Sequence, residues 1–276
     1  MGEQDAHFYF ERDLVDERPG PFSFGDVVVH TSRSPDKETR NEDAAAILPV
    51  DEKRAVLVVA DGVGGHPEGG RAAALAIRTL RKSVEKELAD DRALREAILS
   101  GFDRANAAVI ERTPGGATTL AAAEIDDGSL RTYHVGDSAM LVFGGRGRIR
   151  HQTISHSPVG YAVQAGLLDE QDAMQHEDRH LISNCLGDPS MHVGMSSRIA
   201  LRPRDTVLIA SDGLFDNLHT EEIVQLMRRG PLEHSVRRVA ALCIERMASG
   251  AEGRPSKPDD LTVIAFRRRV ASGKPG

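Results

Sequence analysis

Residues 56–66 read VLVVADGVGGH, a run of five apolar residues followed by Asp61 and by three glycines within four positions. The apolar run has the composition of a buried strand. A carboxylate at the end of a buried strand costs free energy unless it is paired or bound to a metal ion. Glycine after Asp61 leaves a bare backbone that turns sharply and lets its own carbonyl approach an ion. This stretch therefore predicts a buried strand that ends at a cation site.

The same pattern recurs elsewhere in the chain. The acidic sites at expected strand ends are Asn41-Glu42-Asp43, Asp61, Asp137, Asp212 and Asp259-Asp260. A single Asp-Gly pair is better explained as a turn, because turns favour both residues. Five such sites together, with almost no His or Cys among them, indicate oxygen ligands for Mg²⁺ or Mn²⁺ rather than for zinc.

The order of the expected elements favours an α+β fold. Strands are expected at residues 24–31, 43–48, 55–60, 118–125, 129–135, 138–143, 147–152, 205–211 and 261–269, and helices at 68–89, 92–112, 220–229 and 232–249. Strands joined by hairpin-type turns predict antiparallel pairing, whereas a parallel doubly wound fold would need regular alternation of strands and helices. We therefore expect a four-layer α-β-β-α sandwich, in which two mainly antiparallel sheets are flanked by helix pairs.

Length and composition limit the classes of protein. The 276 residues carry a formal net charge of −7, which gives no general attraction for nucleic acid or for an anionic membrane. The two cysteines, Cys185 and Cys243, have no CxxC spacing, and no apolar run has the length of a membrane span, so a cytoplasmic location is expected. We expect a monomer with one domain at residues 21–270, an extension at 1–20, a tail at 271–276 and a flap at about 156–195.

Eight motifs give the chain a resemblance to a known family. In chain order they are NEDA (41–44), VVADGVGGH (58–66), GGATTL (115–120), HVGDSAMLV (134–142), SHSP (155–158), HEDRHLISNCLG (176–187), IASDGLFDNL (209–218) and DDLTVIAF (259–266). Together they resemble the metal-dependent protein phosphatases, called protein phosphatase type 2C or PPM, in their bacterial form. The resemblance implies a β-sandwich with a two-metal centre between the sheets, which hydrolyses phosphoserine and phosphothreonine in proteins.

Four positions of the resemblance concern the ions that carry the chemistry. Asp61 would bridge both ions, and the carbonyl of Gly62 would bind one of them. Asp212 and Asp259 would hold the first ion. The resemblance thus implies that Asp61, Asp212 and Asp259 are the catalytic residues.

Four further acidic residues complete the implied ligand set. Glu42 and Asp43 would act on the second ion largely through water, and Asp137 and Asp216 match the family's weaker third metal site. The implied cofactors are two Mn²⁺ or Mg²⁺ ions and a weaker third ion. The implied substrate is a phosphorylated protein, and the implied partner activity is a serine/threonine kinase that the enzyme opposes.

Three departures from the family pattern concern the surroundings of the ligands. Family members commonly carry an arginine three residues before the asparagine of NED to bind the substrate phosphate, and here that position is Glu38. Lys37 and Arg40 stand beside it and are the expected substrate-binding residues, although lysine offers a point charge where arginine would be bidentate. Ala139 replaces the usual arginine of GDSR, and Asp260 replaces the usual asparagine after Asp259, which alters hydrogen bonds around the ligands.

Other functions remain open from sequence. A non-catalytic phosphoprotein-binding module of the same fold is one alternative, favoured by the missing arginine, and a phosphatase of a small phosphorylated metabolite is another. Ser138 and Ser211 stand beside aspartates but lack the GxSxG elbow of a serine hydrolase, so we expect them to donate hydrogen bonds to metal-binding carboxylates. His66 is expected to be structural rather than catalytic.

Overall fold

The structure is a computed structural model that describes residues 6–13, 15–20, 22–23, 25–63, 68–250 and 254–269. The expectation for His66 and that for the tail at 271–276 concern residues outside these ranges. No helix in the described ranges is both long and apolar enough to cross a bilayer.

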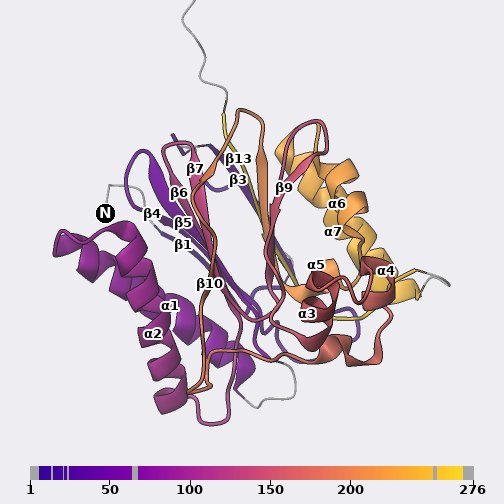
Figure 1. The fold of residues 1–276 in the computed structure, drawn as a ribbon, viewed down its shortest axis with the longest axis horizontal. Coiled ribbons are helices and arrows are strands. Elements are labelled where there is room, and N and C mark those ends of the chain that lie inside the picture. Colours follow the sequence, from indigo (N-terminus) through magenta and orange to yellow (C-terminus); the bar gives the residue numbers. More distant parts are fainter. Residues whose placement is uncertain are drawn as a thin grey trace, which may run out of the picture.

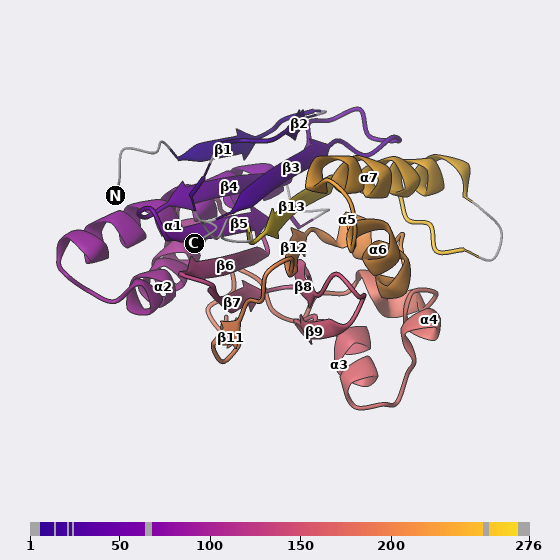
Figure 2. The same ribbon diagram turned by 90° about the horizontal axis from the view of Figure 1, so that it is seen from above.

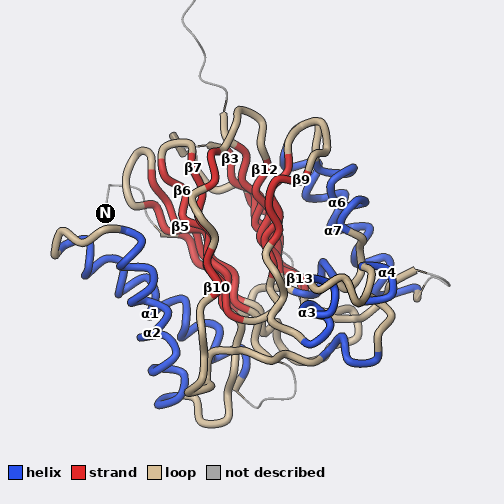
Figure 3. Tube along the Cα trace, in the orientation of Figure 1, coloured by secondary structure: helices blue, strands red, loops and turns tan. Residues whose placement is uncertain are grey.

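Two antiparallel sheets form the centre of the molecule (Figures 1 and 3). The first sheet contains, in spatial order, β1 (His7–Phe10), β4 (Ala44–Pro49), β5 (Arg54–Ala60), β6 (Leu120–Asp126), β7 (Ser129–Val135) and β10 (Gly194–Met195), and β11 (Ile199–Ala200) also pairs with β7. The second sheet contains β2 (Val15–Glu17), β3 (Asp26–Ser32), β13 (Leu261–Arg267), β12 (Thr206–Ala210), β8 (Ala139–Phe143) and β9 (Ile149–Gln152).

Helices cover the outer faces of both sheets (Figures 1 and 2). The first sheet is covered by α1 (Gly69–Ala89) and α2 (Leu94–Arg112), and the second by α6 (Thr220–Met227) and α7 (Leu232–Ser249). The remaining helical segments are α3 (Pro158–Gln164), α4 (Glu170–Ala173), the 3₁₀ helix η1 (Glu177–His180) and α5 (Asp212–Phe215). This arrangement confirms the predicted four-layer α-β-β-α sandwich.

Strand β5 shows why the apolar run of the sequence forms a central strand. Its side chains alternate between two faces, as in any strand. Leu57 and Val59 point into the core between the sheets, whereas Val56 and Val58 face the core beneath α1 and α2. Because both faces of β5 are covered, burial stabilises an uninterrupted apolar run. A strand with one exposed face would instead alternate apolar and polar side chains.

The strand register brings the acidic segments to one end of the sandwich. In an antiparallel pair, the end of one strand lies beside the start of its neighbour. Ala60 is paired with Ala44, so the segments that carry Asp61 and Asp43 meet. In the second sheet Ala210 is paired with Val263, which places the residues after β12 beside those before β13.

Residues 7–10 and 15–17 add a strand to each sheet, although residues 1–20 are expected from sequence to form an extension outside the domain. Phe10 of β1 is paired with Ala44 of β4, and β2 is paired with β3. Phe10 also lies beneath the guanidinium of Arg78 on α1, with 4.9 Å between Cζ and the ring centroid. The described part of this segment therefore belongs to the sandwich. Strands of four and three residues are too short for their periodicity to be recognised in sequence.

Candidate metal centre

The aspartates predicted as metal ligands form one electrostatically coupled group at the end of the two sheets. Asp61 is affected by the charges of Asp43, Asp212, Asp259 and Asp137, each from a different segment of the chain. Burial, and then the charges of its neighbours, raise the pKa of Asp61 well above the ordinary value. The tertiary structure thus unites the four acidic strand ends with Asp61, as the sequence pattern predicts.

Other members of this acidic cluster have perturbed pKa values for the same reason. Burial and then the charge of Asp212 raise the pKa of Asp137 to about 8, that of Asp259 to about 7 and that of Asp216 to about 6. The pKa of the buried Asp43 is likewise raised, by burial and then by the charge of Asp260. Such a concentration of carboxylates is unfavourable without a compensating cation.

Three carboxylate oxygens inside the cluster are unpaired, and this bears on whether these residues fit divalent ions. The Oδ1 atoms of Asp43, Asp137 and Asp212 are buried and have no hydrogen-bond partner. Buried carboxylate oxygens are ordinarily satisfied, and hard divalent cations bind such oxygens. The donor set is therefore chemically suited to Mn²⁺ or Mg²⁺, and not to a soft metal.

A lysine that no sequence motif marks lies within this cluster. The Nζ of Lys257 is 2.6 Å from Asp212 Oδ2, 2.8 Å from Asp216 Oδ2 and 3.3 Å from Asp259 Oδ2. Burial disfavours its charge, but the three aspartates raise its pKa and keep it protonated. As the side chains stand, no group of three or more His, Cys, Asp and Glu residues in the described part of the chain forms a ready ion site.

Hydroxyl groups position two of the buried aspartates. Ser211 Oγ donates to Asp43 Oδ2 at 2.8 Å, which links the start of β4 to the end of β12 and confirms the expected hydrogen bond from this serine to a carboxylate. Ser138 does not contact a carboxylate in this way, since its hydroxyl lies 2.7 Å from Thr119 Oγ1. Thr119 Oγ1 accepts from the backbone N–H of Asp61 at 2.9 Å, so Ser138 acts on Asp61 only through Thr119.

Close backbone packing explains the glycine after two of the aspartates. A Cβ at Gly62 would lie 2.4 Å from the backbone carbon of Gly69, at the start of α1. A Cβ at Gly213 would lie 2.0 Å from the carbonyl oxygen of Asp260. Neither backbone is in the left-handed region. Glycine is therefore required at these two positions because a side chain has no space, and not because the sharp turn predicted from sequence needs a special backbone conformation.

The two expected phosphate-binding residues are engaged by acids. Lys37 Nζ lies 2.6 Å from Glu42 Oε2 and 2.7 Å from Asp260 Oδ2. Arg40 is largely exposed and pairs with Glu11. Asp260 Oδ2 also accepts from the backbone N–H of Glu42 at 2.8 Å. Lys37 therefore compensates the charge that aspartate brings to position 260, and both basic side chains form ion pairs within the protein.

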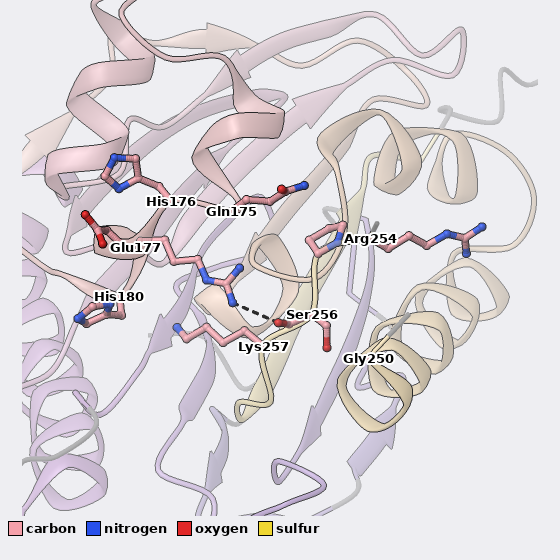
Figure 4. Close-up of a pocket in the computed structure, with 10 residues that line it drawn as sticks. Gln175, His176, Glu177, His180, Gly250, Arg254, Ser256 and Lys257 are labelled. Atoms are coloured by element: carbon pink, nitrogen blue, oxygen red, sulfur yellow. Dashed lines mark hydrogen bonds between the residues drawn. The ribbon is translucent and has the colours of Figure 1, made fainter. Parts of the chain in front are cut away.

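Two cavities flank the acidic cluster on the side of the flap. One, of about 360 Å³, is lined by Asp137, Asp212 and Asp216 together with residues of α3 and α4. The other, of about 600 Å³, lies between η1 and the segment 254–257, and Lys257 is part of its wall (Figure 4). Arg179 Nη2 bridges this cleft by donating to the carbonyl of Ser256 at 3.1 Å. The cluster is thus accessible from beneath the flap.

Three histidines support the base of the flap. The rings of His134 and His156 stack with centroids 4.3 Å apart, and His192 lies 5.1 Å from His156. His156 Nδ1 is 2.8 Å from the amide nitrogen of Asn184 and accepts from the N–H of Gly136 at 3.2 Å. Burial, followed by the neighbouring histidines, lowers the pKa of His156 to about 4.

Acidification is expected to destabilise the fold through His156. Its pKa lies below the ordinary value of 6.5, so the unfolded chain binds the proton first, and stability is lost as pH falls from about 6.5 towards 4. The aspartates with raised pKa values act in the opposite direction, so the difference between the wild type and His156→Asn is the informative quantity. Urea unfolding in EDTA between pH 4 and 8 measures it. A difference that does not change with pH contradicts this expectation.

The fold and the site together define a class of protein: a four-layer sandwich with a cluster of buried carboxylates, suited to divalent cations, at one end of its sheets. The family model of protein phosphatase 2C matches residues 33–246. The chain therefore belongs to the protein phosphatase 2C family, and the resemblance inferred from its eight motifs is confirmed.

Individual relatives agree with this assignment. A putative protein phosphatase 2C-type of Streptococcus pyogenes is 29% identical over 201 residues, which cover 69% of this chain and 80% of that protein. The serine/threonine protein phosphatase PstP of Mycobacterium tuberculosis is 29% identical over 213 residues, covering 76% of this chain but 39% of PstP. The PPM Ser-Thr phosphatase MsPP of Mycobacterium smegmatis, solved with cacodylate, has a TM-score of 0.71 at 28% identity, with 88% of this chain and 97% of MsPP covered.

A solved structure with bound metal shares the fold. The catalytic domain of PstP in complex with two manganese ions has a TM-score of 0.69 at 24% identity, with 88% of this chain and 98% of that domain covered.

Proposed function

We propose that this protein hydrolyses phosphoserine and phosphothreonine in proteins with the help of divalent metal ions. The observation that carries the proposal is the coupled cluster of buried aspartates whose Oδ1 atoms on Asp43, Asp137 and Asp212 have no partner. Membership of the protein phosphatase 2C family and relatives named serine/threonine phosphatases support the same activity. The reaction consumes one water and yields the free hydroxyl side chain and inorganic phosphate.

The proposed roles follow the ligand positions. Asp61 and the Gly62 carbonyl, with Asp212 and Asp259, would hold the ions, and these three aspartates are the proposed catalytic residues. When bound, two divalent ions supply the Lewis acidity that activates water and offsets phosphoryl charge. Ser211 keeps Asp43 in position through its 2.8 Å hydrogen bond.

The outer ligands complete this proposal. Glu42 and Asp43 would act on the second ion largely through water, and Asp137 and Asp216 would form a weaker third site. Mn²⁺ and Mg²⁺ both match the oxygen-only donor set. Lys37 and Arg40 are the proposed substrate-binding residues, and a substrate phosphate would compete with Glu42 and Glu11 for their charges.

The cellular setting is proposed from charge and family. A formal charge of −7 disfavours nucleic acid and anionic membranes as partners. From membership of the protein phosphatase 2C family we propose a monomeric cytoplasmic enzyme that opposes a serine/threonine kinase. A phosphoprotein-binding module without turnover is the second candidate. It is favoured by one observation, the position of Lys257 among Asp212, Asp216 and Asp259.

Turnover of a phosphothreonine peptide separates these two functions. We expect no phosphate release in EDTA and release after Mn²⁺ is added in excess, measured on purified protein with a phosphate assay. Glucose 6-phosphate serves as the small-molecule control. Binding of Mn²⁺ and peptide without any phosphate release would support the binding module instead, and faster release from the sugar phosphate would indicate a metabolite phosphatase.

A further inference from the structure

Lys257 occupies a cation position inside the acidic cluster. An ammonium group has three N–H donors, and Lys257 Nζ lies within 3.3 Å of three carboxylates, those of Asp212, Asp216 and Asp259. Among the residues that the structure describes, no other basic side chain lies within 4.0 Å of any of these three acids. The ammonium is therefore the main counter-charge for this part of the cluster.

Lys257 leaves some carboxylate oxygens of the cluster without a hydrogen-bond partner, which distinguishes its ion pairs from purely structural ones. Asp212 Oδ2 accepts from Lys257 at 2.6 Å, but Asp212 Oδ1 is buried without a partner. Asp137 and Asp212 both line the cavity of about 360 Å³, and Asp137 also has an unpaired Oδ1. A single positive charge with three donors cannot satisfy all of these oxygens, whereas divalent ions bind six or more oxygens each.

We propose that Lys257 is an internal competitor of the metal ions: it holds the acidic cluster together in the metal-free protein and is displaced when a divalent ion binds, so that it sets the metal affinity. This inference rests on the proposed function, because it assumes that Asp212 and Asp259 bind an ion. Two positive groups cannot share these carboxylates closely without repulsion. The measured affinity for the ion therefore reflects the difference between the free energy with which the carboxylates bind the ion and the free energy with which they bind the ammonium.

The cleft beneath the flap gives the displaced side chain a place to go. Lys257 forms part of the wall of this cleft of about 600 Å³, opposite His176, Glu177 and His180 of the flap (Figure 4). The lysine side chain is 21% exposed and has a flexible four-carbon stem. Glu177 offers a carboxylate in the same cleft. Movement into the cleft keeps the ammonium solvated and frees Asp212, Asp216 and Asp259 for the ion.

The test is the binding of Mn²⁺ to metal-free protein, measured by titration calorimetry in the wild type and in Lys257→Met. Methionine has a similar length and no charge. We expect the dissociation constant for Mn²⁺ to fall at least tenfold in Lys257→Met, because no ammonium has to leave. We also expect a lower melting temperature than the wild type in EDTA and an equal or higher one in saturating Mn²⁺.

Two controls keep the inference testable. Lys53→Met removes the same charge from an exposed pair with Asp127 and should leave the Mn²⁺ affinity unchanged. Lys257→Arg retains the charge if Lys257→Met does not fold, and should bind Mn²⁺ no more tightly than the wild type. An unchanged or weaker affinity in Lys257→Met, with normal binding by the wild type, overturns the inference alone. Failure of both proteins to bind Mn²⁺ overturns the proposed metal centre as well.

Discussion

Replacing Asp61 with asparagine is expected to reduce Mn²⁺-dependent turnover at least about a thousandfold, a loss of roughly 4 kcal/mol of transition-state stabilisation. Asp61 lies at the end of β5 and is coupled to four other aspartates of the cluster. Asparagine keeps the shape of the side chain but loses the charge and one of the two carboxylate oxygens with which Asp61 would hold the ions. Steady-state hydrolysis of a phosphothreonine peptide at saturating Mn²⁺ measures the effect.

Stability distinguishes this loss from misfolding. Because the pKa of Asp61 is raised in the folded state, its ionised form opposes folding near neutral pH. The metal-free Asp61→Asn variant should therefore be at least as stable as the metal-free wild type in urea. Asp103→Asn, on the exposed face of α2, is the matched control and should change neither property. Wild-type turnover in Asp61→Asn would exclude the proposed role of this residue.

Replacing Lys37 with methionine is expected to lower the free energy of unfolding by about 3 kcal/mol. The side chain of Asp260 is 4% exposed, and Lys37 Nζ lies 2.7 Å from its Oδ2. Removal of the lysine leaves the Asp260 charge buried, and within the described ranges its remaining donors are the backbone N–H groups of Ser34 and Glu42. Urea unfolding in EDTA at pH 7 measures the change.

A double-mutant cycle tests the cause of this loss. In the Asp260→Asn background the buried charge is gone and Lys37 keeps only its pair with the part-exposed Glu42, so Lys37→Met should cost less than about 1 kcal/mol. Lys53→Met, which breaks an exposed pair, should also change stability by less than about 1 kcal/mol. Equal costs of Lys37→Met in the two backgrounds would show that the lysine acts on something other than Asp260.

This pair also connects two departures from the family pattern that are unrelated in sequence. Asp260 stands where the family pattern implies asparagine, and Lys37 is 223 positions away from it in the chain. The sequence alone indicates Lys37 as a substitute for a missing arginine. In the structure its charge is used within the protein, because a buried carboxylate at position 260 requires a partner.

Local patterns were sufficient for the fold class and for the acidic cluster. The apolar run before Asp61 specifies a strand buried on both faces, and the carboxylates at strand ends converge because antiparallel register brings those ends together. Ser211 is a further example, since its hydroxyl bonds to Asp43 as expected. These features depend on periodicity and residue chemistry, which can be read along the chain.

Tertiary structure alone decided which groups neutralise the carboxylates. No periodicity marks Lys257 in SKPDD, yet its ammonium lies among Asp212, Asp216 and Asp259. Similarly, β1 is too short to be recognised, and only its pairing with β4 makes it a strand. The physical reason is the same in both cases: side-chain pairing and edge-strand pairing depend on distances between segments that are remote in sequence, whereas a buried apolar strand is specified by its own residues.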